Sequence, residues 1–190
     1  SMYRKYSCLK KNKYFFEKYH LEVIQEKDIE TIRKWRNNKL EVLRQNLKIS
    51  KKEQYKYYKN NIWNELKKKY PRNMLFTFNF GNEMIGYGGI VNISWLNKRA
   101  EISFLLDDKI DENSKLYRIY FEKFLTLIKL ISFKEIKIKK IYAETYSFRK
   151  KHIKILSIFG FKKEGYLISQ YYKANKFYNS YIHSLINEAF

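Results

Sequence analysis

The order of apolar and polar positions in the first third of the chain predicts a strand followed by two helices. His20–Ile24 alternates with the period of two expected of a strand, and Asp28 to about Arg36 has apolar residues at helical spacing. A second helix begins after Ser50, since Ser50 and Glu53 form the S-x-x-E pattern in which each side chain satisfies the other's backbone N–H. This helix is expected to stop at Pro71.

The middle of the chain predicts three consecutive antiparallel strands and a buried helix. The strands are Met74–Phe80, Glu83–Ile93 and Arg99–Leu106, separated by short polar turns. The helix, Ser114–Ile131, is apolar nearly all round, which is typical of a helix packed against a sheet.

The last third predicts a strand, a shorter helix and two final strands. Ile138–Thr145 is the strand, and the helix runs from about Arg149 to Phe159, with Gly160 free to adopt the left-handed cap. The final strands lie around 161–169 and 177–186. The order β-α-α-β-β-β-α-β-α-β-β predicts an α/β (α+β) fold with a mixed, mostly antiparallel central sheet of about seven strands and four helices.

Composition sets the domain organisation. With 190 residues, one proline and six glycines, the chain fits one compact domain without linkers. We expect residues 1–18 to be a solvated basic arm and residues 19–190 to be the domain. No run approaches the length of a membrane span, and the single Cys8 cannot form an internal disulfide, so we expect a cytoplasmic protein.

The charge indicates anionic partners. Forty Lys and Arg residues against nineteen Asp and Glu give a formal net charge of +21. Such an excess bears on partners and solubility more than on fold. Because 32 of the 40 basic residues are Lys, part of this charge could instead reflect an AT-rich coding sequence.

Several classes of chemistry lack their motifs. His20, His152 and His183, with one cysteine, give no metal-ligand spacing, and no phosphate-binding or dinucleotide glycine loop is present. The glycines of Gly86–Gly89 lie inside a predicted strand. There they indicate a bulge or a close approach of backbones rather than direct ligand binding.

The order of elements and four short segments resemble the GNAT acetyltransferases, which move an acetyl group from acetyl-CoA to an amine. The segments follow the family's order: Ile32–Asn37, Ile85–Ile90, Ala100–Asp107 and Ile158–Gly165. The resemblance covers roughly residues 19–187. It is nearest to the branch that includes ribosomal-protein and amino-sugar N-acetyltransferases.

The resemblance implies where acetyl-CoA binds. The strands Arg99–Asp107 and Ile138–Thr145 would splay apart, so that the pantetheine arm bonds to strand amides, and the pyrophosphate would lie over the start of the next helix. The implied cofactor-binding residues are Phe104, Leu105, Leu106, Asn113, Ser114, Lys115, Arg149 and His152. For Lys115, Arg149 and His152, solvated positions are an open alternative.

One turn departs from the family. Where the family has Q/R-x-x-G-x-G/A, this chain has Lys109-Ile110-Asp111-Glu112-Asn113-Ser114, without either glycine. A glutamate beside a pyrophosphate would repel it. We therefore expect weak CoA binding or a different local geometry.

Two residues are candidates for catalysis. Glu101, in the middle of a strand, is the candidate base, because burial would raise its pKa and the family often has a Glu here that acts through water. An ion pair with a neighbouring Lys or Arg is the alternative. His183 is the candidate acid, by analogy with a family tyrosine, and a hydrogen-bonded histidine within the sheet is its alternative.

The resemblance also assigns the acceptor side to the first two helices and their connecting loop. The substrate-binding candidates are Trp35, Arg36, Asn37, Arg44 and Gln45, with Trp35 equally suited to the core. A +21 surface would repel a polycationic aminoglycoside and attract a nucleotide-linked amino sugar or a ribosome-bound protein.

These inferences give one main hypothesis and two alternatives. The main one is an acetyl-CoA-dependent N-acetyltransferase, monomeric or homodimeric, that acts on an anionic small molecule, most simply a nucleotide-linked amino sugar. The first alternative is a ribosomal-protein or other protein N-acetyltransferase. The second is an inactive GNAT-like module that binds RNA or another polyanion through Lys and Tyr.

Overall fold

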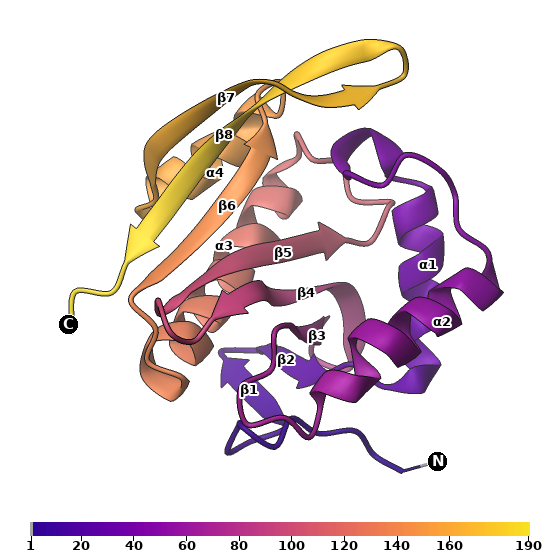
Figure 1. Ribbon diagram of the computed structural model, residues 1–190, viewed down its shortest axis with the longest axis vertical. Helices are drawn as coiled ribbons and strands as arrows, with labels where there is room; N and C mark the ends of the chain where they lie inside the picture. The colour runs from indigo at the N-terminus through magenta and orange to yellow at the C-terminus, as the bar shows by residue number, and fades with distance from the viewer. Residues whose placement is uncertain (1) are drawn as a thin grey trace.

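The fold is built on one sheet of eight strands, seen in a computed structural model that describes residues 2–190 (Figure 1). The strand order across the sheet is β1-β2-β3-β4-β5-β6-β8-β7, and every neighbouring pair is antiparallel except β5 and β6. The strands are β1 (Lys13–Phe16), β2 (Tyr19–Val23), β3 (Met74–Phe80), β4 (Glu83–Ser94), β5 (Arg99–Leu106), β6 (Lys140–Tyr146), β7 (Lys162–Lys173) and β8 (Lys176–Ile186).

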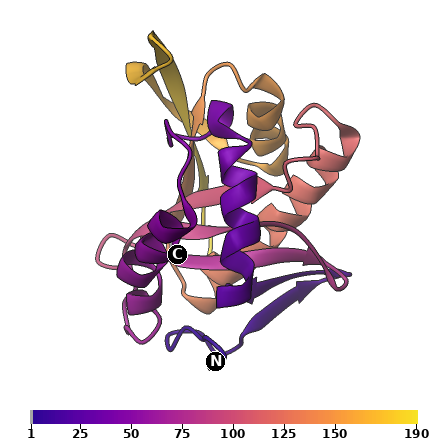
Figure 2. The same cartoon turned by 90° about the vertical axis from the view of Figure 1, so that its right-hand side faces the viewer.

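Two pairs of helices cover the two faces of this sheet (Figures 1 and 2). On one face, α1 (Ile29–Asn37) and α2 (Lys51–Asn61) form a small core with Leu105 of β5. On the other, α3 (Lys115–Lys129) and α4 (Lys150–Phe159) form the larger core with Leu106. Short 3-10 turns lie at Glu26–Asp28, Leu40–Val42 and Trp63–Glu65, and a π-helical turn, Leu130–Glu135, follows α3.

The predicted fold class and element order are confirmed, and the sheet contains one strand more than predicted. The extra strand, β1, lies in the stretch expected to be a solvated arm. Tyr6 is 2% exposed, and its hydroxyl accepts a hydrogen bond of 2.8 Å from the backbone N–H of Leu75. Tyr14 in β1 is buried as well. The expectation of a solvated arm is therefore wrong for these residues, because their tyrosines are apolar enough to join the core.

The second helix is shorter than predicted. It ends at Asn61, and a 3-10 turn over Trp63–Glu65 follows, well before Pro71. Ile62 and Leu66 are still buried after the helix has ended. Their spacing of four is what a continuing helix would show, so periodicity alone could not locate the end.

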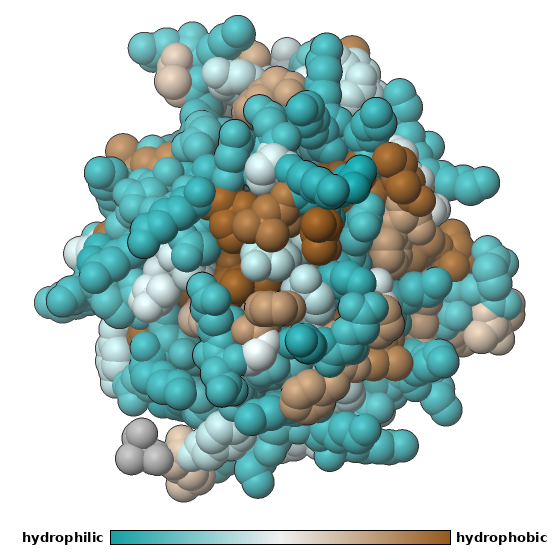
Figure 3. Space-filling view, turned by 180° about the vertical axis from the view of Figure 1, so that it is seen from behind, coloured by the Kyte–Doolittle hydropathy of each residue, from teal (hydrophilic) through white to brown (hydrophobic). Residues whose placement is uncertain are grey.

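The face behind the view of Figure 1 is mainly hydrophilic. Polar residues surround separate apolar patches there, as Figure 3 shows. Lysine supplies most of the basic charge of the sequence. No helix within residues 2–190 is long and apolar enough to cross a membrane.

Two glycines of β4 allow this strand to lie between β3 and β5. A Cβ atom at Gly88 would overlap the carbonyl oxygen of Ser103 in β5, and one at Gly89 would overlap that of Met74 in β3. The glycines are thus required by close backbone approach, as the sequence indicated.

We expect Gly88→Ala to lower the free energy of unfolding by about 3 kcal/mol, because β4 or β5 must shift to admit the methyl group. Gly165→Ala in β7 is the matched control. Its added Cβ would meet only the Ile182 side chain, at 3.5 and 3.6 Å, which are ordinary contacts. Urea unfolding followed by circular dichroism measures both, and equal losses would contradict the explanation.

Candidate active site

The site lies where β5 and β6 separate. These parallel strands are paired only at Arg99 with Lys140, Ala100 with Ile141, and Glu101 with Tyr142. Beyond Glu101 they diverge, while β6 continues along β8 (Figure 1). The rest of β5 therefore has backbone groups on one edge that β6 does not satisfy, as the expected splay requires.

A cavity of about 380 Å³ occupies this divergence. Its walls come from both strands, from β4, from the α1–α2 connection and from the start of α4. The charged side chains that line it are Arg36, Arg44, Glu101, Glu144 and Arg149. The uncharged polar side chains include Asn92 and His152.

Glu101 is the most buried of the carboxylates that line this cavity, with 6% exposure. One oxygen accepts a hydrogen bond of 3.0 Å from the Asn92 side-chain amide, and the other forms an ion pair with Arg44. The ion pair that was the alternative at this position is present, and Glu101 still lines the cavity.

Asn92 holds the Glu101 carboxylate from a bulge that sequence reasoning missed. The register of β4 and β5 shifts between Val91 and Ser94, and Asn92 has a φ of 49°. Asparagine tolerates this left-handed conformation better than most residues. An Asn directly after the glycine-containing segment of a long strand was the available signal.

Two of the five acceptor candidates line the cavity. Arg44 is on the loop after α1 and pairs with Glu101. Arg36, at the end of α1, donates hydrogen bonds to the Tyr87 hydroxyl at 2.7 Å and to the Gln45 side chain at 3.0 Å. Both place a guanidinium in the wall of the cavity.

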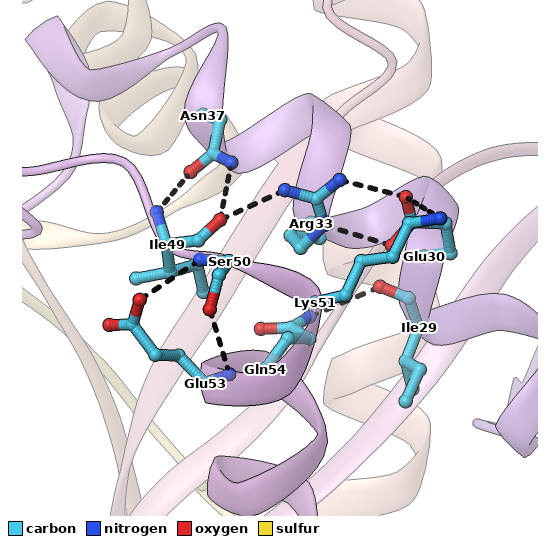
Figure 4. Close-up of polar contacts among 9 residues, drawn as sticks. All are labelled: Ile29, Glu30, Arg33, Asn37, Ile49, Ser50, Lys51, Glu53 and Gln54. Atoms are coloured by element: carbon cyan, nitrogen blue, oxygen red, sulfur yellow. Dashed lines mark hydrogen bonds and ion pairs between the residues drawn. The ribbon is translucent and has the colours of Figure 1, made fainter.

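The other three candidates have structural roles. Trp35 is buried between α1 and α2, in the core. Asn37 binds the backbone of Ile49 through both its oxygen and its nitrogen, and so fixes the end of the α1–α2 loop next to the Ser50 cap (Figure 4). Gln45 bridges Arg36 and Asn37. None of the three lines the cavity, because Trp35 is in the core, its alternative position, and the polar groups of Asn37 and Gln45 bind the loop.

The candidates on β5 lie along its unpaired part. Phe104 lines the cavity and stacks on Phe121 of α3, with ring centroids 4.5 Å apart. The side chains of Leu105 and Leu106 are buried on opposite faces of the sheet. Only their backbone groups are available to a ligand in the divergence.

The turn before α3 is closed by its own residues. Ser114 caps the helix by accepting a hydrogen bond of 3.1 Å from the Tyr117 N–H, and it donates to the Asp111 carbonyl. Asn113, Ser114 and Lys115 line a separate cavity of about 510 Å³. Its cations come from both helices: Lys115, Arg118, Lys151 and Lys154.

Glu112, which was expected to repel a pyrophosphate, is neutralised. Arg149 at the start of α4 contacts its carboxylate at 2.5 Å through Nη2 and at 3.0 Å through Nε. The same guanidinium lies 3.3 Å from the Tyr117 hydroxyl. Arg149 is thus neither solvated nor free: it joins the turn to α4.

A sequence profile of the acetyltransferase (GNAT) domain matches residues 21–182. The chain belongs to the GNAT acetyltransferase family. It is therefore an acyltransferase that uses acetyl-CoA as its acetyl donor. No curated protein is similar enough in sequence to count as a relative.

Solved structures of GNAT enzymes share the fold. The spermidine N-acetyltransferase of Vibrio cholerae, in complex with CoA and spermine, aligns with a TM-score of 0.77 over 90% of this chain and 97% of its own, at 16% identity. A dodecameric structure of that enzyme in an intermediate state aligns at 0.73 over 90% and 95%, also at 16% identity. At this identity the similarity establishes the GNAT fold and leaves the acceptor open.

The residues of this GNAT domain fit CoA at two places. The unpaired edge of β5 after Glu101 offers backbone groups of the kind that a pantetheine arm can pair with. The start of α3 offers helix N–H groups beside Lys115 and Arg118.

His152 lines the cavity as a neutral ring. It is buried, stacks on Phe121 with centroids 4.3 Å apart, and its Nδ1 lies 2.8 Å from the Tyr117 hydroxyl. Burial, and then the charge of Arg149, lower the pKa of His152 well below 6.5. It is not the solvated residue that was the alternative.

His183 does not line this cavity. It lies on β8 opposite Ala143, is 2% exposed, and its Nδ1 has no hydrogen-bond partner among residues 2–190. Burial, and then Lys163, lower the pKa of His183. At least one ring nitrogen of His183 is therefore not hydrogen-bonded, and the proposed role as an acid stays a prediction.

The two buried histidines predict acid sensitivity. The unfolded chain takes up protons near the ordinary histidine pKa of 6.5, whereas folded His152 does so only at lower pH. The contribution of His152 to the free energy of unfolding should therefore not change with pH above 6.5. Below that pH it should fall by about 1 kcal/mol per pH unit.

Thermal unfolding between pH 5 and 8 measures this dependence. His152→Gln keeps a polar side chain but cannot titrate, so its unfolding temperature should fall less steeply on acidification than that of the wild type. An unchanged slope in the variant would show that His152 is not a source of the acid sensitivity.

Proposed function

We propose that this enzyme acetylates the amine of a nucleotide-linked amino sugar by direct transfer from acetyl-CoA, with Glu101 as the base. The observation that carries the proposal is the buried Glu101 carboxylate, which lines the cavity where β5 and β6 diverge. A proton acceptor is needed at such a point because an ammonium cannot attack a thioester.

Acetyl-CoA supplies the activated acetyl group, and the chain's own residues prepare the amine. Glu101 accepts a proton from the acceptor ammonium, directly or through one water molecule. Asn92 and Arg44 hold the carboxylate in one orientation.

CoA is held by groups that the fold leaves available. The backbone of Phe104–Leu106 binds the pantetheine arm, and the α3 N-terminus with Ser114 and Lys115 binds the phosphates. His152 and Phe104 form the apolar wall on the α3 and α4 side. Arg149 acts indirectly, by neutralising Glu112.

The charges in the cavity support an acceptor that is not a polycation. Three arginines, Arg36, Arg44 and Arg149, line the cavity with two carboxylates, those of Glu101 and Glu144. Arg36 adds positive charge on the acceptor side. A polyamine such as that bound by the Vibrio cholerae enzyme would meet cations here, whereas phosphates attached to the acceptor would be attracted.

Location and assembly stay predictions. Cys8, the single cysteine, is free, in keeping with the cytoplasmic location we propose. We retain a monomer or homodimer as the proposed assembly. Family membership favours the enzyme over an inactive polyanion-binding module.

An acceptor panel tests the proposed function. The release of CoA from acetyl-CoA is measured with a nucleotide-linked amino sugar, the same amino sugar without its nucleotide, spermidine and a peptide with a free N-terminus. We expect kcat/KM to be at least about tenfold higher for the nucleotide-linked compound than for any other. A preference for spermidine or for the peptide would overturn the proposed acceptor.

Glu101→Gln, assayed with the best acceptor of that panel, tests the base. We expect kcat to fall about 100-fold or more, with the Kd for CoA almost unchanged in calorimetry. Glu144→Gln is the control, because it removes the charge of another carboxylate in the same cavity. It distinguishes loss of the base from a general loss of negative charge. Unaltered turnover in Glu101→Gln would remove Glu101 from the mechanism.

The turn before α3 gives a separate prediction about CoA affinity. Arg149→Gln leaves the Glu112 carboxylate unpaired beside the phosphate-binding helix start, so we expect the Kd for CoA to rise about tenfold. The double variant Arg149→Gln with Glu112→Gln removes both charges and should recover most of the affinity. Calorimetry with CoA measures all three proteins, and equal losses in the single and double variants would contradict this explanation.

A further inference from the structure

A second cavity, of about 530 Å³, lies beside the active-site cavity. It is formed by the end of β6 with the residues that follow it, and by the tip of the β7–β8 hairpin. The two cavities share Tyr146 as a lining residue. The Tyr146 hydroxyl donates a hydrogen bond of 3.0 Å to the Leu43 carbonyl, so this shared ring is fixed in place.

Aromatic rings form much of its wall. Tyr146 and Phe148 stack with centroids 5.3 Å apart and an interplanar angle of 14°. Tyr178 meets Phe148 edge to face at 5.5 Å. Phe148 is 47% exposed and Phe177 is 61% exposed. Two large rings at the mouth of one cavity are thus left partly uncovered by the protein.

Two lysines accompany these rings. Lys176 lies on the rim, with its ammonium 5.7 Å from the centre of the Tyr178 ring. Lys173 donates a hydrogen bond of 2.5 Å to the Leu43 carbonyl, so its ammonium is held by that loop. Glu41 is the carboxylate in the lining. Flat aromatic faces beside cations suit a ligand that has both a flat ring and negative charge.

We propose that this second cavity binds the nucleoside diphosphate part of the acceptor. The base stacks against Phe148 and Phe177, Lys176 binds a phosphate, and the sugar passes Tyr146 to bring its amine to Glu101. This inference rests on the proposed function, since it places the nucleotide that the proposed acceptor carries.

The nucleotide of CoA belongs elsewhere. The cavity at the start of α3 has its own cations, and the residues that line it are entirely different from those of the second cavity. An acceptor nucleotide and CoA can therefore be bound at the same time. This is what direct transfer between two bound substrates requires.

Calorimetry with uridine 5′-diphosphate tests the site without relying on turnover. The titration uses protein saturated with CoA, so that the CoA site is closed to the probe. We expect binding, and we expect Phe148→Ala to weaken it about tenfold, the scale of losing one ring from a base stack. Lys176→Ala should also weaken it and should reduce its salt dependence.

Phe15→Ala is the matched control. Phe15 is as exposed as Phe177, at 61%, and it lies on β1, at the opposite edge of the sheet from β7. We expect this variant to bind the diphosphate as the wild type does. Thermal unfolding of each variant verifies that it is folded.

Failure of the inference is distinct from failure of the proposed function. No binding in the presence of CoA, or equal binding by wild type, Phe148→Ala and Lys176→Ala, would overturn the second site even if nucleotide-linked sugars are acetylated. Binding that depends on Phe148 and Lys176 supports the site even if the acceptor panel shows that another amine is acetylated.

Discussion

The site depends on the loss of pairing between β5 and β6 after Glu101. In a continuous sheet, the backbone groups of both strands would satisfy each other and no space would remain between them. Here β6 is instead paired with β8 along its whole length, so it leaves β5 without being unfolded itself. The divergence thereby supplies the cavity, a free strand edge of the kind that a pantetheine arm can pair with, and the position of Glu101, the proposed base. The other residues of the site act within the space that this divergence creates.

Two ion pairs in the site distinguish this chain from the family pattern. Arg44 pairs with the carboxylate of Glu101 in the cavity. Arg149 pairs with Glu112 at the turn where the family has glycines. A glycine turn presents bare backbone to a pyrophosphate. In this chain, an arginine from the neighbouring helix cancels the acidic side chain, so the helix start keeps a favourable field for anions. The glycine turn of the family and the Arg149–Glu112 pair of this chain differ in sequence, but both leave the start of the helix without an unpaired negative charge.

Local patterns were sufficient for most of the fold. The strand Arg99–Leu106 was predicted with its observed bounds, because alternation and turns are properties of neighbouring residues. The strand β1 was missed, since the burial of Tyr6 and Tyr14 depends on contacts with residues far along the chain, such as Leu75. The end of α2 was missed because a 3-10 turn can preserve the spacing of a helix.

The site was predictable only in part, and the reason is the range of its contacts. Glu101 could be singled out because its place in a family-like segment is local, and it lines the cavity, whereas its partner Arg44 is 57 residues away and is one of forty basic residues. Asn37 and Gln45 were misassigned because nothing local shows that they bind the loop instead of a ligand. His183 does not line the cavity, and its position opposite Ala143 depends on a register that the partner strands set.

The fixed arginines of the site and the many surface lysines contribute to the positive charge in different ways. Most lysines lie on the surface and act over long range, where salt screens them. The arginines of the site are instead held at fixed positions: Arg36 by Tyr87, Arg44 by Glu101 and Arg149 by Glu112. A mobile lysine surface can attract any polyanion, but it cannot place an amine within reach of one carboxylate. For the anionic acceptor that we propose, selection would therefore depend on the few cations that the fold has fixed, and net charge would determine only how often the acceptor arrives.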